Sequence, residues 1–183
     1  AADTTLTLSG TPASVTAGGS AGVTVTAKDA FGNVATGYTG TVHFTSTDGA
    51  ATLPGDYTYV GGDAGSHTFS VTLNTTGSRT ITATDTVTGS ITFDSNGHMT
   101  DPPAAITVNA GAASTATSTI SAAPGSITAN GSSTSTITVQ LKDALGNNLA
   151  GSGGTIALNT TAGSLSAVTD NTIVQAIRGI RQT

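Results

Sequence analysis

The fold is decided by the stretch GVTVTAKDAFGN, Gly22–Asn33. Valine and alanine alternate with threonine in its first half, and a period of two is typical of a β-strand with one buried face. Its second half contains Asp, Gly and Asn, which favour tight turns. Asp and Asn side chains hydrogen-bond to the nearby backbone, and Gly permits positive φ. A closely similar run, TITVQLKDALGNN, recurs at Thr136–Asn148. The sequence therefore predicts the same strand and turn twice.

This recurrence is part of an internal repeat. Lys28–Asn33 matches Lys142–Asn147 at an offset of 114 residues, and Pro12–Ser20 matches Pro124–Ser132 at an offset of 112. A repeat of about 110 residues has the size of one β-sandwich domain. We therefore expect an all-β chain of two tandem sandwiches, joined by a short linker of small residues at 109–114.

The composition excludes several classes of protein. Only 8% of the 183 residues are charged and no Glu is present, so the residues that build helices are scarce. No apolar run approaches the roughly 18 residues of a membrane-spanning helix, so no membrane span is expected. The net charge of -5 argues against a nucleic-acid partner. The lack of Cys excludes disulfides and thiolate metal sites.

Alternating apolar residues predict seven short strands in the first repeat, which indicates a sandwich. They are centred on Leu6 and Leu8, Val23–Ala27, Val42 and Phe44, Tyr57 and Tyr59, Phe69–Leu73, Ile81 and Ala83, and Ile106 and Val108. The second repeat offers strands at Ile120, Ile137–Leu141, Ile156 and Leu158, and Leu165. Threonines between these positions either solvate the surface without charge or form an ordered hydroxyl array that binds ice or carbohydrate or carries O-linked glycan; we favour the first interpretation.

The second repeat is cut short. We expect a sandwich at 4–110, an incomplete sandwich at 113–170 and a foreign tail at 171–183, whose apolar residues from Ile173 to Ile180 follow helical spacing. A reading-frame shift or fragment end near residue 171 is our hypothesis for the tail. Half a sandwich leaves an apolar face and an open edge. We therefore predict that the tail, the first domain or a second copy of the chain completes it, the last by self-association.

Both runs resemble a known family. Gly22–Asn33 looks like the strand B and turn of bacterial immunoglobulin-like domains, and Thr136–Asn148 resembles the group-1 domains of invasin and intimin. The resemblance extends to Asp170. It implies tandem immunoglobulin-like β-sandwiches in a secreted or cell-surface bacterial protein, with neighbouring immunoglobulin-like domains as partners and no catalysis. The first ten residues lack the pattern of a signal peptide, so an exported parent would carry this chain as an internal piece.

Carboxylates offer a candidate metal site. Asp48, Asp56 and Asp63 lie in one loop-rich stretch and are the candidate ligands of a calcium ion; solvated turn formers are the alternative. The same choice applies to the turns at Asp29 and Asp143, for which we favour a purely structural role because no bidentate Glu is available.

Aromatic residues offer a candidate ligand site. Sugar-binding platforms present aromatic rings, so Tyr38, Tyr57 and Tyr59 are the candidate glycan-binding residues if they share one exposed patch. His43 is expected to face away from the core and His67 to lie at its margin, and their spacing to each other and to His98 does not predict a metal site or catalytic triad.

We therefore expect a structural or adhesive module that spaces or presents other parts of a bacterial surface protein and contacts a host surface or glycan. A glycan-binding accessory module of a secreted enzyme is the alternative. A hydrolase is a third possibility, because the chain holds Ser, His and Asp.

Overall fold

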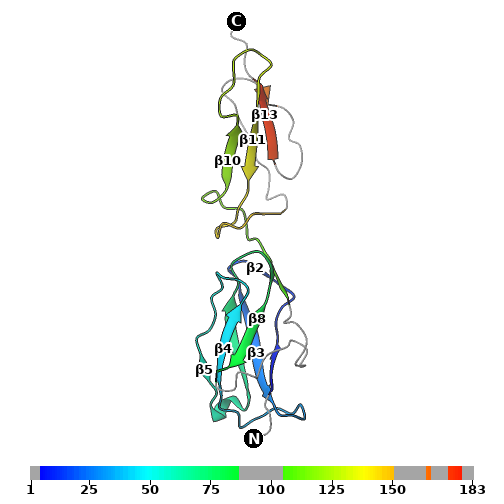
Figure 1. Ribbon diagram of the computed structural model, residues 1–183, viewed down its shortest axis with the longest axis vertical. Coiled ribbons are helices and arrows are strands. Elements are labelled where there is room, and N and C mark those ends of the chain that lie inside the picture. The colour runs from blue at the N-terminus through cyan, green and yellow to red at the C-terminus, as the bar shows by residue number, and fades with distance from the viewer. Residues whose placement is uncertain (1–4, 87–104, 151–163, 166–172, 179–183) are drawn as a thin grey trace. The chain divides into compact units, whose positions relative to one another are not determined.

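The computed structural model in Figure 1 describes residues 5–86 and 105–150, and the backbone alone at 164–165 and 173–178. The chain divides into two compact units, Ala1–Asn109 (unit 1) and Ala110–Thr183 (unit 2). Apart from the short 3-10 helix η1 (Gly61–Asp63), the described residues form strands, turns and loops. The all-β prediction is confirmed. No helix in these ranges is long and apolar enough to cross a membrane.

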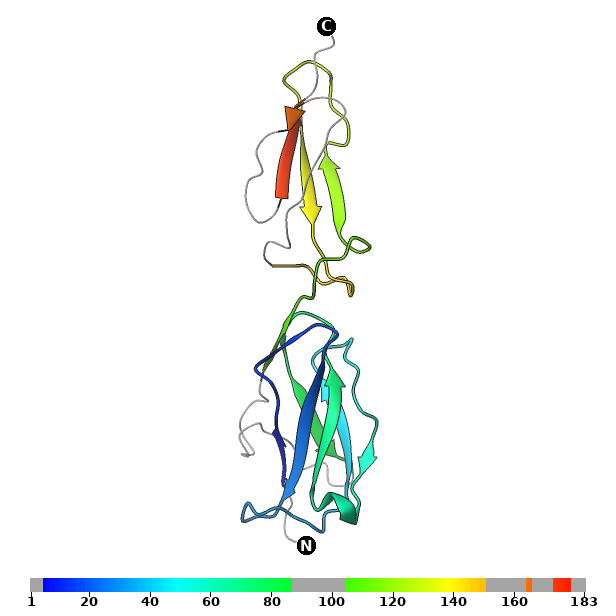
Figure 2. The same ribbon diagram turned by 180° about the vertical axis from the view of Figure 1, so that it is seen from behind.

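Unit 1 is made of short strands in three small sheets. The strands are β1 (Thr5–Ser9), β2 (Ser14–Thr16), β3 (Ser20–Lys28), β4 (Thr41–Ser46), β5 (Tyr57–Thr58), β6 (Ser66–Thr72), β7 (Gly77–Arg79), β8 (Ile81–Asp85) and β9 (Ile106–Asn109). The sheet orders are β1-β3-β6, β5-β4-β8 and β2-β9-β7. Figure 2 shows β3 and β6 side by side. All pairings are antiparallel except that of β2 with β9.

The core of unit 1 lies between the sheets of β3 and β4. Val23, Val25 and Ala27 alternate with outward threonines, as predicted, and are fully buried. The rings of Phe44 on β4 and Phe69 on β6 meet edge to face at 4.7 Å and join the two sheets. The remaining buried apolar residues are Leu6, Leu8, Ala21, Val42, Tyr59, Val71, Leu73, Ile81, Ala83, Ile106 and Val108. The seven strands predicted for this repeat are therefore confirmed.

Outward hydroxyls on β3 and β6 bond to each other across the strands. The Oγ1 atoms of Thr24 and Thr68 lie 2.8 Å apart, and the Oγ atoms of Ser20 and Ser70 lie 2.6 Å apart. Cross-strand hydroxyl pairs of this kind contribute to sheet pairing. The outward Thr and Ser residues thus stabilise this sheet without adding charge.

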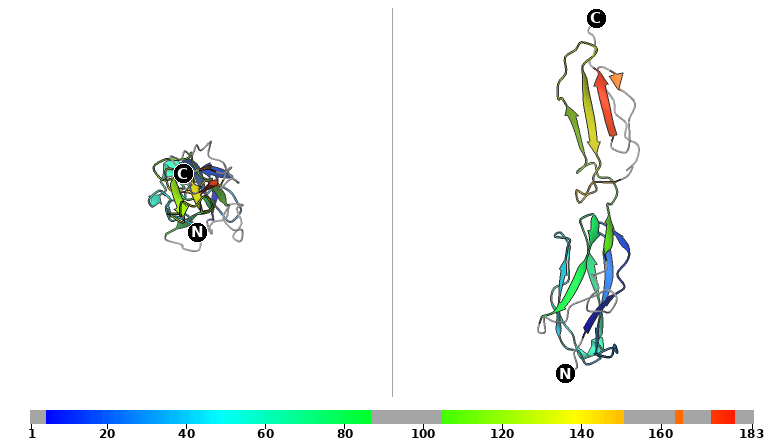
Figure 3. Two further views of the ribbon diagram at one scale, coloured as in Figure 1. Left: turned by 90° about the horizontal axis from the view of Figure 1, so that it is seen from above. Right: turned by 45° about the vertical axis from the view of Figure 1, so that its right-hand side comes forward.

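The described residues of unit 2 form one sheet in the order β10-β11-β13-β12. Its strands are β10 (Thr119–Ala123), β11 (Thr134–Gln140), β12 (Ser164–Leu165) and β13 (Ile173–Arg178). Figure 3, in its right panel, shows β11 in yellow beside β13 in red. The strand expected at Ile156 and Leu158 lies outside the described residues.

The pairing register of unit 2 repeats that of unit 1. Ile120 lies opposite Val139 as Leu8 lies opposite Val25, so β10 and β11 take the places of β1 and β3 at offsets of 112 and 114 residues. The tail strand β13 takes the place of β6. Its residues form a strand and not the helix that their spacing indicated, because pairing with β11 satisfies their backbone groups. The reading-frame hypothesis stays a prediction.

The equivalent positions differ in burial. Leu8 is 6% exposed, whereas Ile120 is 64% exposed. In unit 1 this face is packed against the opposite sheet, and β1 lies against β8. Among the described residues of unit 2, no second sheet covers Ile120.

Candidate functional site

The three tyrosines proposed as ligand-binding residues meet inside unit 1. The Tyr59 ring lies 5.0 Å from that of Tyr38 and 5.6 Å from that of Tyr57, in both cases edge to face. Tyr59 is only 1% exposed, and its hydroxyl donates to the Val25 carbonyl at 2.8 Å. Tyr38 and Tyr57 are partly buried against the core. The structure brings the three rings together as a core cluster, so they do not form the exposed patch that a sugar platform needs.

The Tyr38 and Tyr57 hydroxyls of this cluster each donate a hydrogen bond to an Asp carboxylate. The Tyr38 hydroxyl donates to Asp85, which is buried at the end of β8, and the Tyr57 hydroxyl donates to both oxygens of Asp63 at 3.2 Å. Burial, followed by the hydrogen bond to Asp85, raises the pKa of the Tyr38 phenol well above its ordinary value. These phenols therefore stay protonated and serve as donors.

Asp63 organises the edge of the core beside β6. It accepts hydrogen bonds from the Val60 amide at 2.8 Å and, at the same distance, contacts Nδ1 of His67. The His67 ring stacks on Tyr57 at 4.3 Å and lies 4.7 Å from Phe69. The Val60 amide, with His67 and Tyr57, holds the pKa of Asp63 below its ordinary value. His67 thus occupies the core margin, as the sequence pattern predicted.

The candidate calcium ligands lie apart. Asp48 is buried and binds backbone amides, Asp56 contacts Nδ1 of exposed His43 at 2.6 Å, and Asp63 belongs to the cluster above. Across residues 5–86 and 105–150, no group of three His, Asp or Glu side chains is placed to hold a metal ion. His43 faces away from Val42 and Phe44, as expected.

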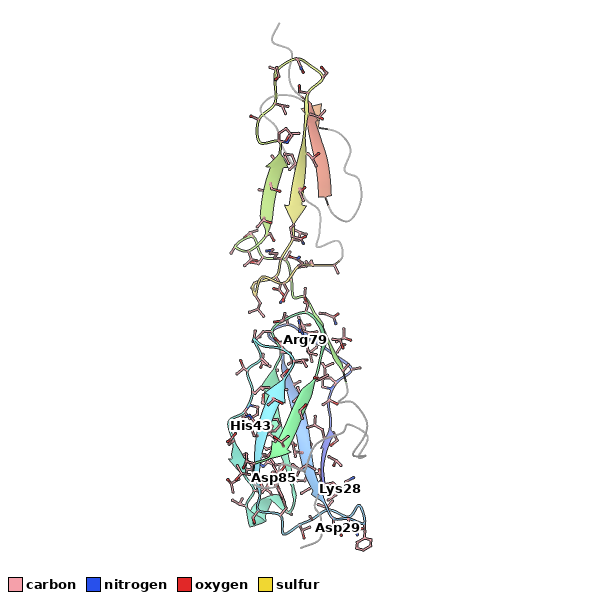
Figure 4. The ribbon with its side chains drawn as sticks, viewed as in Figure 1. Lys28, Asp29, His43, Arg79 and Asp85 are labelled. Atoms are coloured by element: carbon pink, nitrogen blue, oxygen red, sulfur yellow. The ribbon has the colours of Figure 1, made fainter. Side chains whose placement is uncertain are left out.

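Asp48 and Arg79 form a hydrogen-bonded cluster, here called the polar clasp, which connects the loop after β4 to the loop after β6. The sequence did not predict it. Asp48 accepts from the amides of Ala50 at 3.0 Å, Asn74 at 2.7 Å and Thr75 at 2.9 Å. Arg79, labelled in Figure 4, donates to the carbonyls of Thr75 and Thr76 at 3.1 and 2.8 Å. Arg79 is the one arginine in residues 1–109, which is the signal that could have marked this clasp.

The repeated motif forms the same turn in both units. Oδ1 of Asp29 accepts from the amides of Phe31 and Asn33 at 2.9 Å. Oδ1 of Asp143 accepts from Leu145 at 3.0 Å and Asn147 at 2.9 Å. Both turns need glycine at their fourth position, where φ is +83° in Gly32 and +86° in Gly146. Figure 4 places Lys28 and Asp29 where β3 ends.

The histidines of the described residues are not arranged as a catalytic triad. Each of His43 and His67 uses Nδ1 to contact an Asp carboxylate, and no serine hydroxyl bonds either ring within the described part of the chain. His98 lies outside the described residues. The described His and Asp residues therefore stabilise loops and the edge of the core. Among the described residues, no serine hydroxyl is placed as a nucleophile beside either His–Asp pair.

Comparison with known proteins identifies the fold. Residues 114–173 match the family model described as "Invasin, domain 3", which confirms the resemblance predicted from Thr136–Asn148. No curated protein matches the chain in sequence.

Solved structures of bacterial adhesins align with this chain, and that of invasin supports the fold. The crystal structure of invasin, described as a bacterial integrin-binding protein, superposes with a TM-score of 0.53 at 22% identity over 95% of this chain. That alignment spans 34% of the invasin chain, so this chain covers about a third of its length. FdeC, an Escherichia coli adhesin, aligns at 23% identity over 97% of this chain and 56% of its own, with a TM-score of 0.48. The invasin comparison confirms an immunoglobulin-like β fold.

Proposed function

We propose that this chain is an adhesive structural module of an exported bacterial surface protein, where it spaces or presents the parts that make contact with a host surface. The match of residues 114–173 to the invasin domain model carries this proposal. The adhesive context comes from proteins that share the fold, which are described as an integrin-binding protein and an adhesin. Neighbouring immunoglobulin-like domains are the partners that such a role requires.

The strand pairing of unit 1 supports a load-bearing role. β9, which ends the unit, runs parallel to β2 near its start, with Ser14 opposite Thr107 and Thr16 opposite Asn109. The Ala17 amide donates to the Asn109 carbonyl at 2.8 Å, and the Thr107 amide donates to the Ala13 carbonyl at 3.0 Å. A pull on the two ends of the unit therefore acts along this ladder and loads its hydrogen bonds together.

The test places unit 1 (residues 1–109), which contains the buried core, between a membrane anchor and a terminal epitope tag on a bacterial surface. We expect the tag to stay on the cell during protease treatment, because a sealed core denies a protease access to extended backbone. Phe44→Asp, which buries a charge, should release the tag, whereas Thr45→Asp at the exposed neighbouring position should retain it. Cleavage of the unaltered chain as fast as the Phe44→Asp variant would contradict the proposal.

A further inference from the structure

The two Asp turns have the same internal hydrogen bonds but different surroundings. In unit 2, Oδ2 of Asp143 also accepts a hydrogen bond from the Gly111 amide at 3.0 Å. Gly111 belongs to the segment by which the chain enters the unit. Asp143 therefore fixes the entering backbone in addition to shaping its own turn.

Further bonds hold this entering segment on the strand end. The Ser114 amide donates to the Lys142 carbonyl at 2.7 Å, and the Thr117 hydroxyl donates to the Asp143 carbonyl at 2.6 Å. The Lys142 amide in turn donates to the Ser118 hydroxyl at 3.0 Å. Burial raises the pKa of Asp143, but hydrogen bonds from Asn147 and Gly111 outweigh it, so the carboxylate stays ionised as an acceptor.

The turn of unit 1 is more open than that of unit 2 at Asp29 and Phe31. Asp29 is half-buried, whereas its equivalent Asp143 is only 2% exposed. Phe31 is 87% exposed, whereas Leu145, its equivalent at an offset of 114 residues, is 52% exposed. The Phe31 ring at the end of β3 is therefore open to contact from a neighbouring segment.

The repeat register identifies what fits this surface. Thr119 corresponds to Thr7 at an offset of 112 residues, so Ala113 corresponds to Ala1 and Gly111 to a position two residues ahead of it. We infer that Asp29 and Phe31 form the docking surface for the linker of an immunoglobulin-like domain joined on the N-terminal side of unit 1. One backbone amide of that linker donates to Oδ2 of Asp29, as Gly111 donates to Asp143. This inference rests on the tandem role proposed above, and it names the residues that set the junction.

The test lengthens the chain by one unit in the native register. Residues 1–112 are fused directly ahead of Ala1 of the full chain. Gly111 of the added copy then lies two residues before Ala1 of the original copy. The protein contains no Trp. A Phe31→Trp substitution in the original copy alone therefore gives one fluorescent reporter, whose quenching by acrylamide measures its exposure in the original and the lengthened chain.

Quenching of this reporter should fall by about two-fifths on lengthening, which is the step from the 87% exposure of Phe31 to the 52% of Leu145. Gly111→Pro in the added copy should reverse the fall because proline has no N–H, whereas the matched Gly111→Ala keeps the donor and should preserve it. Equal quenching in both chains, a fall that persists with proline, or a reporter already shielded in the original chain would each overturn the inference.

The same samples separate this inference from the proposed function. Thermal unfolding of each variant shows whether the units are folded, independently of the reporter. Unchanged quenching in fully folded proteins would reject the docking surface alone, while the surface-display assay decides the structural role.

Discussion

Replacing Asp48 tests the polar clasp of unit 1. Its carboxylate is 3% exposed and accepts from the amides of Ala50, Asn74 and Thr75, which belong to two different loops. Hydrogen bonds to a charged group contribute about 1.5–3 kcal/mol each, and bonds that share one acceptor group are not additive. We expect Asp48→Ala to lower the free energy of unfolding by about 3–4 kcal/mol, and the melting temperature of unit 1 by about 10–20 °C.

Two matched variants isolate the cause. Asp48→Asn keeps one carbonyl oxygen as an acceptor, so we expect about half of the loss. Asp56→Ala removes an exposed carboxylate that contacts exposed His43, and surface ion pairs contribute at most about 1 kcal/mol. Urea unfolding followed by circular dichroism measures all three variants. Equal destabilisation by Asp48→Ala and Asp56→Ala would refute the reasoning.

The clasp also predicts a pH dependence. Burial opposes ionisation of Asp48, but the amides of Thr75, Ala50 and Asn74 outweigh it and lower its pKa below the ordinary 3.8. A depressed pKa in the folded state stabilises the protein above 3.8, and this stabilisation disappears as the pH falls through the lowered value. The stability gap between the unaltered chain and Asp48→Asn should therefore be constant near neutral pH and narrow below pH 3.8. A gap that does not change under acid conditions would assign the effect to packing.

Other substitutions test the core and the turns. Tyr59→Phe removes the hydroxyl that donates to the buried Val25 carbonyl and should cost about 1–2 kcal/mol in chemical unfolding. Leu8→Ala should lower the free energy of unfolding by about 2–4 kcal/mol, because Leu8 is 6% exposed. The equivalent Ile120→Ala should lower it by less than about 1 kcal/mol, because Ile120 is 64% exposed. Similar losses for the two variants would mean that a second sheet covers Ile120 in solution. Gly65→Ala would bring the new Cβ to 2.5 Å from the Ala35 carbonyl oxygen, at a φ of +81°. Gly32→Ala has a similar φ of +83°, but its Cβ would meet no atom within 4 Å. The melting temperature of the Gly65→Ala variant should therefore be well below that of the Gly32→Ala variant.

The sequence predicted the strands of unit 1 well because their burial alternates. Val23, Val25, Val42 and Phe44 each face the core as their period of two requires. β2 and β7 were not predicted, since each has three residues and no run of alternating apolar side chains. β13 was missed for another reason. Its pairing with β11 joins residues about 40 positions apart, which local spacing does not report.

The candidate site was predicted less well because partners distant in the sequence decide each residue's role. Asp48 looked like a calcium ligand, but its acceptor oxygens are used by Asn74 and Thr75, 26 and 27 residues away. Tyr59 looked like part of a sugar platform, but its bond to Val25 spans 34 residues and places the ring in the core. By contrast, the turn at Asp29 was predicted as structural because all its bonds lie within five residues.

Stretching single molecules by their two ends tests the central claim, that unit 1 is a sealed sandwich built to carry load. The described strands of unit 1 run from Thr5 to Asn109. The account predicts one abrupt rupture of this unit that releases about 35 nm of chain, at roughly 3.3–3.6 Å for each residue. Val25→Asp, at a fully buried position, should abolish that rupture. Smooth extension of the unaltered chain, with no rupture of that length, would contradict the account.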